Sequence, residues 1–307
     1  MIKHIYGDFF LLKLFFGGSV DAEKIQKIPD KENSMLKFKQ YYRVKSLEEA
    51  YELNQKKSNV VVGGMLWLKL QRRTIGGVID LSDLGLDHIS ETADAFTIGA
   101  MVPLRDLEQH EGLRAYLGEA LHESLRHIVG VQFRNVATVG GSIFGRFGFS
   151  DVLTLFLALD AKVKFYQAGE LPLSVYASSA PLDKELKNDI LEAVILPKHV
   201  EAAAYRSVRN SETDFPVLTC CAAKVDGVYR VSVGARPMRA AYTADLTGIL
   251  KDGITPEAAA AFGKWVSEQF AAGSNVRASA DYRKKMIAVL TKRNVLDLAA
   301  QEKGGQR

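Results

Sequence analysis

The stretch that decides the fold reads Asn135-Val136-Ala137-Thr138-Val139-Gly140-Gly141-Ser142-Ile143, and Ser150-Asp151 follows at short range. A β-branched run ends in two glycines and a serine, after which a short loop leads into an apolar helix. Glycine has no Cβ, so paired glycines allow backbone N–H groups to approach and surround an anionic group. A second pair ends the β-branched run Val60-Val61-Val62-Gly63-Gly64. We therefore expect two strand-to-glycine turns that enclose one diphosphate from two sides.

Size and composition indicate a globular protein. The chain has 307 residues, more than one average domain, so two domains are expected. Apolar residues make up 47% and charged residues 25%, which is enough material for a sizeable core. The net charge of +4 is small, and no long block of lysine and arginine occurs. We therefore expect no nucleic-acid partner.

The cysteines and histidines do not form a metal-binding pattern. Cys220 and Cys221 are the only cysteines, and they are adjacent. Neighbouring cysteines rarely form a disulfide, and two sulfurs cannot supply the four ligands of a zinc or iron–sulfur site. The six histidines are scattered, without a His-x-x-x-His pair. If the protein takes part in metal-based redox chemistry, we expect the metal on another chain.

The N-terminal segment predicts neither a membrane span nor a secretory signal. No apolar run reaches the roughly 20 residues that a membrane span needs, so no membrane association is expected. The apolar run 9–16 is short, contains Lys13 and follows Asp8, without a small-residue cleavage site nearby. A domain start is expected at Met35. Residues 1–34 are therefore interpreted as an N-terminal extension of unclear role.

Helical and strand patterns alternate through the first part of the chain, which predicts an α/β or α+β layer. Ser46-Leu47-Glu48-Glu49 is a capping box that opens a helix to about residue 57. Residues 60–62 are predicted as a buried strand and residues 65–70 as a helix, with the first glycine pair between them. Residues 131–139 are predicted as a strand that ends at the second pair. Ser150 is predicted to cap an apolar helix from residue 151 to about 158.

The pattern changes after Pro197, which is predicted to end the first domain. Strands are expected at residues 202–208, 215–224 and 228–234, the last two joined by an Asp226-Gly227 hairpin turn. Helices are expected at residues 255–271 and 278–300. These elements predict a three-stranded antiparallel sheet backed by helices.

The order and spacing of these motifs resemble one protein family. The series Val-Gly-Gly, Asn-Val-Ala-Thr-Val-Gly-Gly-Ser-Ile, Ser-Asp and Ala-Leu-Asp-Ala resembles the FAD-binding (medium) subunit of the molybdenum hydroxylases, that is, the xanthine dehydrogenase, carbon monoxide dehydrogenase and nicotinate dehydrogenase flavoproteins. The resemblance runs from Met35 to Asp297. It includes Ile190-Leu191-Glu192, the segment 205–209 with Asp214, and the segment 281–284. The form Gly-Gly-Met-Leu-Trp-Leu-Lys is most similar to separately encoded flavin subunits of purine or nicotinate hydroxylases.

The resemblance implies an α+β fold. Residues 35–198 would form a vanillyl-alcohol-oxidase-like (PCMH-type) FAD-binding domain of two α/β subdomains. Residues 199–303 would form a carbon monoxide dehydrogenase flavoprotein-like C-terminal domain. The resemblance also implies two partner subunits, one with [2Fe–2S] clusters and one with molybdopterin, in a cytoplasmic complex. Electrons would pass from the iron–sulfur subunit through FAD to NAD(P)+ or another acceptor.

The resemblance also assigns cofactor contacts to individual positions. The expected contacts with FAD are Val60, Val61, Val62, Gly63, Gly64, Met65, Leu66, Trp67, Ile128, Thr138, Val139, Gly140, Gly141, Ser142, Asp151, Leu191 and Arg206. Asp151 would accept a hydrogen bond from a polar part of FAD. Arg206 occupies a position where the family often has lysine, and Met65 one where it often has Thr, Gln or Asn. Met65 therefore lacks a side-chain hydrogen bond that many relatives have, although its backbone N–H remains.

Other interpretations of the same residues stay open. Either glycine pair alone is also compatible with an ordinary turn. Asp151 is also compatible with a carboxylate that only complements the dipole of its helix, and Trp67 with a residue of the core. Arg206, Arg209 and Asp214 are also compatible with a structural ion-pair group. A stand-alone flavin oxidoreductase of the same superfold and a flavin-free assembly subunit are the alternative functions. A P-loop hydrolase is disfavoured because neither pair precedes Gly-Lys-Ser/Thr.

Overall fold

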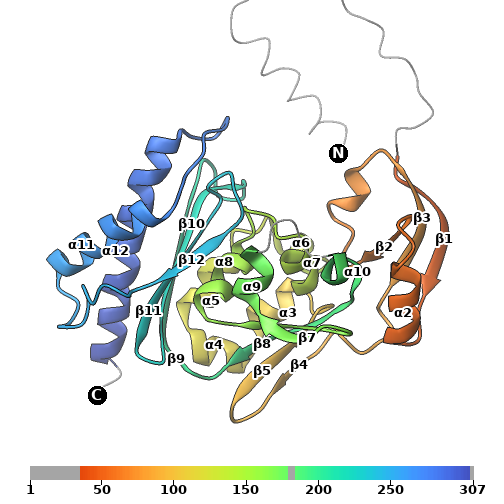
Figure 1. The fold of residues 1–307 in the computed structure, drawn as a ribbon, viewed down its shortest axis with the longest axis horizontal. Helices are drawn as coiled ribbons and strands as arrows, with labels where there is room; N and C mark the ends of the chain where they lie inside the picture. The colour runs from red at the N-terminus through yellow and green to blue at the C-terminus, as the bar shows by residue number, and fades with distance from the viewer. Residues whose placement is uncertain (1–34, 179–183, 305–307) are drawn as a thin grey trace, which may run out of the picture. The chain divides into compact units, whose positions relative to one another are not determined.

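The computed structural model describes residues 35–178 and 184–304. The predicted extension, residues 1–34, lies outside the described residues. Residues Met35–Arg307 cluster as one unit, within which the described strands form three sheets. Figure 1 shows the order of these elements along the chain.

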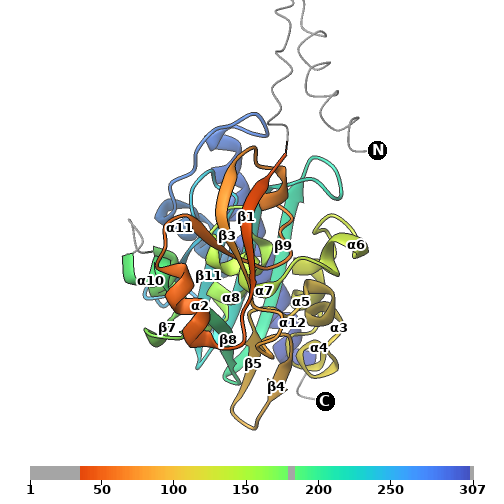
Figure 2. The same ribbon diagram turned by 90° about the vertical axis from the view of Figure 1, so that its right-hand side faces the viewer.

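The first sheet is parallel and has the strand order β1-β3-β2. Its elements are β1 (Lys37–Arg43), α2 (Leu47–Asn54), β2 (Asn59–Val62) and β3 (Thr74–Asp80). The predicted capping serine is confirmed, because Ser46 Oγ accepts a hydrogen bond from the Glu49 N–H at 3.1 Å. Figure 2 shows α2 beside the strands of this sheet, to the left of β1. Since β2 ends at Val62, the first glycine pair follows a strand as predicted.

The second sheet is antiparallel, with the strand order β4-β5-β8-β6-β7. Its strands are β4 (Ile89–Glu91), β5 (Ala95–Gly99), β6 (Lys162–Phe165), β7 (Gly169–Pro172) and β8 (Leu191–Pro197). The helices between these strands along the chain are α3 (Leu104–Gln109), α4 (Glu111–Leu117), α5 (Glu119–Leu125), α6 (Val131–Arg134), α7 (Val139–Phe144), α8 (Asp151–Ala158), α9 (Leu173–Ser178) and α10 (Lys184–Asn188). Every residue of α8 is buried, and Ser150 Oγ caps it by accepting from the Leu153 N–H at 3.1 Å, so the predicted buried helix is confirmed.

The third sheet has four antiparallel strands in the order β12-β11-β10-β9, one more than predicted. Its elements are β9 (Val200–Arg209), β10 (Pro216–Val225), β11 (Val228–Gly234), β12 (Ala241–Ala244), α11 (Pro256–Gln269) and α12 (Ala280–Gly304). The additional strand, β12, pairs with β11 at the edge of the sheet. The chain leaves the second sheet at Pro197 and enters the third at Val200.

The third sheet is covered on both faces, which explains its apolar central strand. Side chains alternate between the two faces of a strand. Accordingly, Cys220 packs with the apolar residues of α11 and α12, whereas Cys221 packs with those of α5 and α8. Figure 1 shows α11 and α12 on one face and α5 and α8 on the other. The neighbouring cysteines therefore serve two different cores, and burial raises the pKa of the Cys220 thiol to about 12.

Two predicted elements are wrong. Residues 131–139 form the short helix α6 and the start of α7 rather than a strand, because the Thr138 hydroxyl accepts a hydrogen bond from the Gly141 N–H at 3.1 Å and caps a helix there. The second glycine pair thus lies in the first turn of a helix instead of at a strand end. The helix predicted at 65–70 is limited to the 3₁₀ turn η2 (Leu68–Leu70).

Candidate functional site

A cavity of about 930 Å³ contains most of the residues assigned to cofactor binding. That volume falls in the range of ligand and cofactor pockets. The assigned residues that line it are Val60, Val61, Val62, Gly63, Gly64, Met65, Leu66, Trp67, Ile128, Thr138, Gly140, Gly141, Ser142, Asp151 and Leu191. Val139 and Arg206 are not among its lining residues. The third sheet also reaches the cavity, through Arg209 of β9 and Pro216 of β10.

The two glycine pairs lie directly against each other at this cavity. A Cβ on Gly64 would lie 1.9 Å from the carbonyl oxygen of Val136, and a Cβ on Gly63 would lie 2.5 Å from Thr138 Oγ1. Both distances are too short for any side chain. Glycine is therefore required in the first loop (residues 63–67) because the second loop (residues 136–142) packs against its backbone.

The first loop has free hydrogen-bond donors. Within the described residues, no hydrogen bond uses the backbone N–H groups of Gly63, Gly64, Met65 and Leu66. Met65 has φ 56°, a left-handed conformation that a residue with a side chain adopts at a cost of about 1–2 kcal/mol. Successive backbone N–H groups around a left-handed residue form a concave donor set that suits an anion. The first loop can therefore donate several hydrogen bonds to a phosphate.

The second loop supplies space rather than free amides. The Val139 N–H donates to Val102 O and the Gly140 N–H to Ala100 O. Gly140 is required because a Cβ there would lie 2.6 Å from Ala100 O. A Cβ on Gly141 would meet only Thr138 Oγ1, at 3.1 Å, so this glycine leaves its side of the cavity open. Val139 is fully buried and contributes to the core instead of the cavity.

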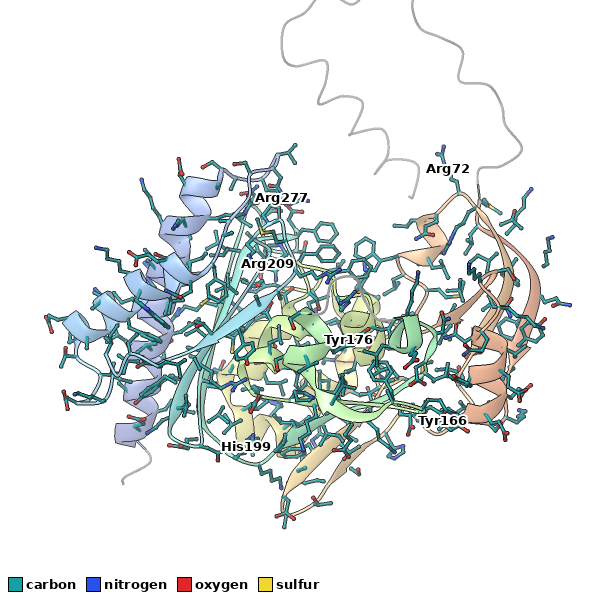
Figure 3. All side chains as sticks on the ribbon, in the orientation of Figure 1. Arg72, Tyr166, Tyr176, His199, Arg209 and Arg277 are labelled. Atoms are coloured by element: carbon teal, nitrogen blue, oxygen red, sulfur yellow. The ribbon has the colours of Figure 1, made fainter. Side chains whose placement is uncertain are left out.

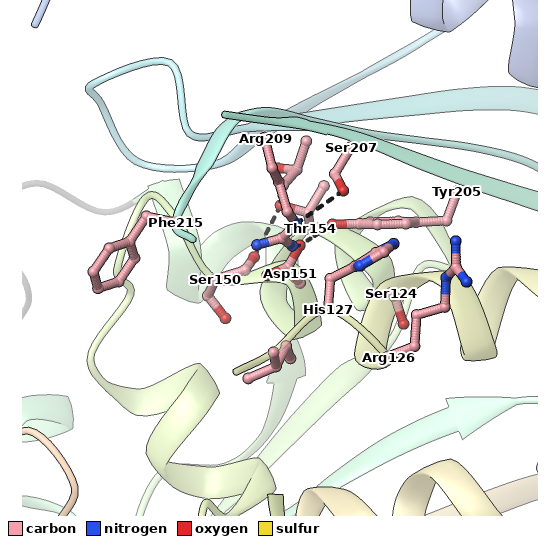
Figure 4. A network of polar contacts seen from close by, with 12 residues as sticks. Ser124, Arg126, His127, Ser150, Asp151, Thr154, Tyr205, Ser207, Arg209 and Phe215 are labelled. Carbon is pink, nitrogen blue, oxygen red and sulfur yellow. Dashed lines mark hydrogen bonds and ion pairs between the residues drawn. The ribbon is translucent and has the colours of Figure 1, made fainter. Parts of the chain in front are cut away.

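Asp151 is the centre of a buried polar network, drawn in Figure 4. Its Oδ1 accepts hydrogen bonds from Tyr205 Oη at 2.6 Å and from Arg209 Nη2 at 2.5 Å. Burial raises the pKa of Asp151, and the charge of Arg209 opposes that shift. Burial and the Asp151 carboxylate raise the pKa of Tyr205 well above its usual value, so Tyr205 stays a hydroxyl donor. Because both contacts use Oδ1, Oδ2 is the oxygen that can accept a hydrogen bond from a ligand.

Arg209, not Arg206, reaches the cavity. The Arg206 guanidinium forms an ion pair with Asp297 of α12 at 2.6 Å, with both side chains about two-fifths exposed. Arg209 is almost fully buried and donates to Asp151, to Ser207 Oγ at 3.2 Å and to the Asp214 carbonyl at 2.6 Å. Side-chain alternation along β9 explains the difference, since residues 206 and 209 face opposite sides of the sheet.

Aromatic rings line one end of the cavity, and of these only Trp67 was assigned from the sequence. The five rings come from three segments distant in the sequence and from the first loop: Trp67, Phe133, Phe147, Phe149 and Phe215. Phe149 contacts Phe215 at a centroid distance of 4.7 Å, and Phe147 stacks on Phe149 at 5.2 Å. Figure 3 places Arg209 and Arg277 at the same end of the third sheet. The Phe-Gly-Phe segment before Ser150 was the one local signal for this cluster.

Another part of the cavity lining is polar and basic. It consists of Asn54, Lys56, Lys57, Asn59, Lys187, Asn188 and Asp189. Asp189 is buried and accepts hydrogen bonds from the backbone N–H groups of Gln167, Ala168 and Ile190. The cavity lining therefore combines an aromatic cluster, the two glycine loops and a polar, basic group.

Within residues 35–178 and 184–304, no group of three or more His, Cys, Asp or Glu side chains is arranged to hold a metal ion. In that part of the chain, no helix has both the length and the apolar character required to cross a bilayer.

Known proteins resemble this chain in sequence. A family model described as the FAD binding domain in molybdopterin dehydrogenase matches residues 36–212. The nicotine 6-hydroxylase medium subunit of Paenarthrobacter nicotinovorans is 23% identical over 277 residues, which cover 83% of this chain and 95% of that subunit. The uncharacterized protein YgfM of Escherichia coli is 30% identical over 191 residues, 61% of this chain and 70% of that protein.

Solved structures resemble it in fold. Carbon monoxide dehydrogenase from Hydrogenophaga pseudoflava gives a TM-score of 0.74 at 22% identity, covering 86% of this chain and 98% of the other. Quinoline 2-oxidoreductase from Pseudomonas putida gives 0.72 at 19% identity, covering 86% and 97%. The α+β fold of the medium FAD subunits is therefore confirmed. With a family model matching more than half of its length, this chain belongs to the FAD-binding domains of molybdopterin dehydrogenases and is an oxidoreductase subunit.

Proposed function

We propose that this chain is the FAD-carrying electron-transfer subunit of a cytoplasmic molybdenum hydroxylase complex of the purine or nicotinate dehydrogenase type. Its partners would be an iron–sulfur subunit and a molybdopterin subunit. When bound, FAD would supply the redox chemistry, taking electrons from [2Fe–2S] clusters on the partner and passing them to NAD(P)+ or another acceptor. The observation that carries the proposal is a single cavity lined by both glycine loops and by Asp151.

The residues present fit FAD in three respects. The free N–H groups of residues 63–66 suit the diphosphate, and the missing Cβ of Gly141 leaves room beside it. The aromatic end suits a flat ring system, with Ile128 and Leu191 as apolar contacts. Asp151, held in orientation by Tyr205 and Arg209, offers Oδ2 to a hydrogen-bond donor of the ligand.

This chain would therefore bind, orient and shield the cofactor rather than supply a proton or a nucleophile. Burial keeps the Tyr205 hydroxyl protonated and the cysteine thiols inert, so neither is available for acid–base or nucleophilic chemistry. The position of the cofactor would be fixed by the loops on one side and the third sheet on the other. These roles match a subunit that relays electrons for metal centres on other chains.

Isolation of the native complex tests the proposal. The tagged full-length chain would be purified under mild conditions and analysed for co-purifying subunits, iron, molybdenum and flavin. We expect iron and molybdenum to co-elute with a yellow chain. A yellow protein that is free of both metals and oxidises a substrate alone would favour the stand-alone flavin oxidoreductase. A colourless chain in a metal-containing complex would favour the flavin-free assembly subunit.

A further inference from the structure

Trp67 and Phe215 meet across the cavity. Their ring centroids are 5.3 Å apart and their planes are inclined by 29°, a stacked arrangement. Trp67 belongs to the first loop, which follows β2 of the first sheet, whereas Phe215 directly precedes β10 of the third sheet. Phe149 contacts both rings, at centroid distances of 5.9 and 4.7 Å. This one cluster therefore joins the first loop to the start of β10, two parts of the chain that both line the cavity.

We infer that Trp67 and Phe215 form an aromatic clamp that closes the cavity over the bound dinucleotide and sets the rate at which it leaves. The inference rests on the proposed FAD-binding role and adds the retention of the cofactor to it. Direct contact between the two sides means that the rings must separate before a bulky ligand can pass between them.

The Phe215 side of the clamp is held rigidly. The Arg277 guanidinium lies 5.1 Å from the centre of the Phe215 ring and forms an ion pair with Asp214 at 3.2 Å. Asp214 also accepts a hydrogen bond from the Phe215 N–H at 2.7 Å, and its carbonyl accepts one from Arg209. Burial would raise the pKa of Asp214, but the hydrogen bonds and charges of these neighbours hold it below its usual value. Phe215 is thus fixed by charged contacts on its own side.

The Trp67 side is held more weakly. Trp67 is 39% exposed and lies in a loop whose N–H groups at residues 63–66 have no partner in the described part of the chain. The left-handed conformation of Met65 adds strain to the same loop. Its two remaining ring contacts, with Phe149 and Phe133, are edge-on at centroid distances of 5.9 and 6.3 Å. Opening therefore requires movement of the first loop and leaves the ion pairs around Phe215 intact.

A second stacked pair provides a matched control. Trp265 and Phe262 in α11 are stacked at a centroid distance of 5.6 Å with an interplanar angle of 22°. These rings pack in the core between α11, α12 and the third sheet and do not line the cavity. The chain has only two tryptophans, and each stacked pair contains one of them, so each pair can be tested by replacing a single tryptophan. Loss of either tryptophan removes a similar contact, but only Trp67 can affect release of the ligand.

The test measures the rate of FAD release from the full-length chain. FAD-loaded wild type, Trp67→Ala, Trp67→Phe and Trp265→Ala are diluted into an excess of a flavin-scavenging apoprotein, and flavin fluorescence is followed. Loss of one aromatic pair should change the release rate by roughly two- to tenfold, and Trp67 takes part in several such pairs. We expect release about tenfold faster for Trp67→Ala, near-normal release for Trp67→Phe, and no change for Trp265→Ala despite its lower melting temperature.

The possible results separate the clamp from the underlying function. Wild-type release rates in Trp67→Ala would overturn the clamp and leave FAD binding intact. Failure of the wild-type chain to bind FAD would overturn both. If Trp67→Ala does not fold, Phe215→Leu takes its place in the same assay, and an unchanged release rate there would equally overturn the clamp.

Discussion

Substitution of Gly141 by valine separates cofactor binding from folding more cleanly than any other change at the glycine loops. Gly141 lines the cavity, and a Cβ there has one neighbour within 4 Å, Thr138 Oγ1 at 3.1 Å. That hydroxyl needs to move by only a few tenths of an ångström. Valine has a slightly better helix propensity than glycine, so we expect the melting temperature to change by only a few degrees.

The effect on FAD affinity should be large. The valine methyl groups would occupy the space beside the first loop and displace the diphosphate from its donors. A hydrogen bond to a charged group contributes about 1.5–3 kcal/mol, and loss of two at the lower value amounts to about 3 kcal/mol. Since every 1.4 kcal/mol is a factor of ten, the Kd for FAD should rise about 100-fold. Titration of the apoprotein with FAD, followed by flavin fluorescence, measures this change.

A nearby glycine serves as the control. Gly130 has an extended backbone with φ −157°, and a Cβ there would meet only Gln132 Oε1, at 3.8 Å. Gly130→Val should therefore keep the FAD affinity within about threefold of wild type. If Gly141→Val also binds FAD with wild-type affinity, the diphosphate does not lie against Gly141 and the assignment of the second loop is wrong.

Three further predictions concern stability and pH. Gly64→Ala should lower the free energy of unfolding by about 2–3 kcal/mol, because its Cβ would lie 1.9 Å from a backbone carbonyl of the second loop; an unchanged denaturation midpoint would contradict that packing. Asp151→Ala should lower the free energy of unfolding by about 3–5 kcal/mol, because it leaves the buried Arg209 charge unpaired. Arg206→Ala should lower it by about 1 kcal/mol or less and leave the FAD affinity unchanged. A large loss of FAD affinity in Arg206→Ala would restore the contact assigned to Arg206. Burial, assisted by two nearby arginines, lowers the pKa of His127 below 6.5. The folded state thus favours the neutral imidazole. The resulting contribution to the stability of the folded state is present above pH 6.5 and is lost as the pH falls through the pKa of His127 in the folded protein. His127→Gln should flatten the pH dependence of the melting temperature in the range just below pH 6.5. An identical slope in wild type and variant would refute this role of His127.

Local signals allowed several elements to be predicted correctly from the sequence. The strand before Gly63, the cap at Ser150 and the buried helix after it depend on residues that are neighbours in the chain. The predicted strand at 131–139 was wrong because a β-branched run also tolerates a helix when a threonine hydroxyl caps it, as Thr138 does. The edge strand Ala241–Ala244 was missed because it has four residues and two of them are alanines with low strand propensity.

Contacts between distant segments could be predicted only in part. Tyr205, Ser207 and Arg209 share one face of β9, whereas Arg206 lies on the other. The sequence interpretation assigned Arg206 to the cofactor and did not place Arg209 with Asp151, although the two-residue period of a strand separates these two arginines. By contrast, the stacking of Trp67 on Phe215 joins residues that are far apart in the sequence. No local pattern specifies such a contact, because it depends on how the first and third sheets meet at the cavity.

The central claim is that this chain holds one FAD between its two glycine loops. The most direct measurement is the flavin content of the purified full-length chain after reconstitution with FAD and removal of the excess. The protein is then denatured, and the released compound is identified by chromatography and mass spectrometry. The account predicts one FAD for each chain and its loss from Gly141→Val. A folded wild-type chain from which no FAD is recovered would contradict it.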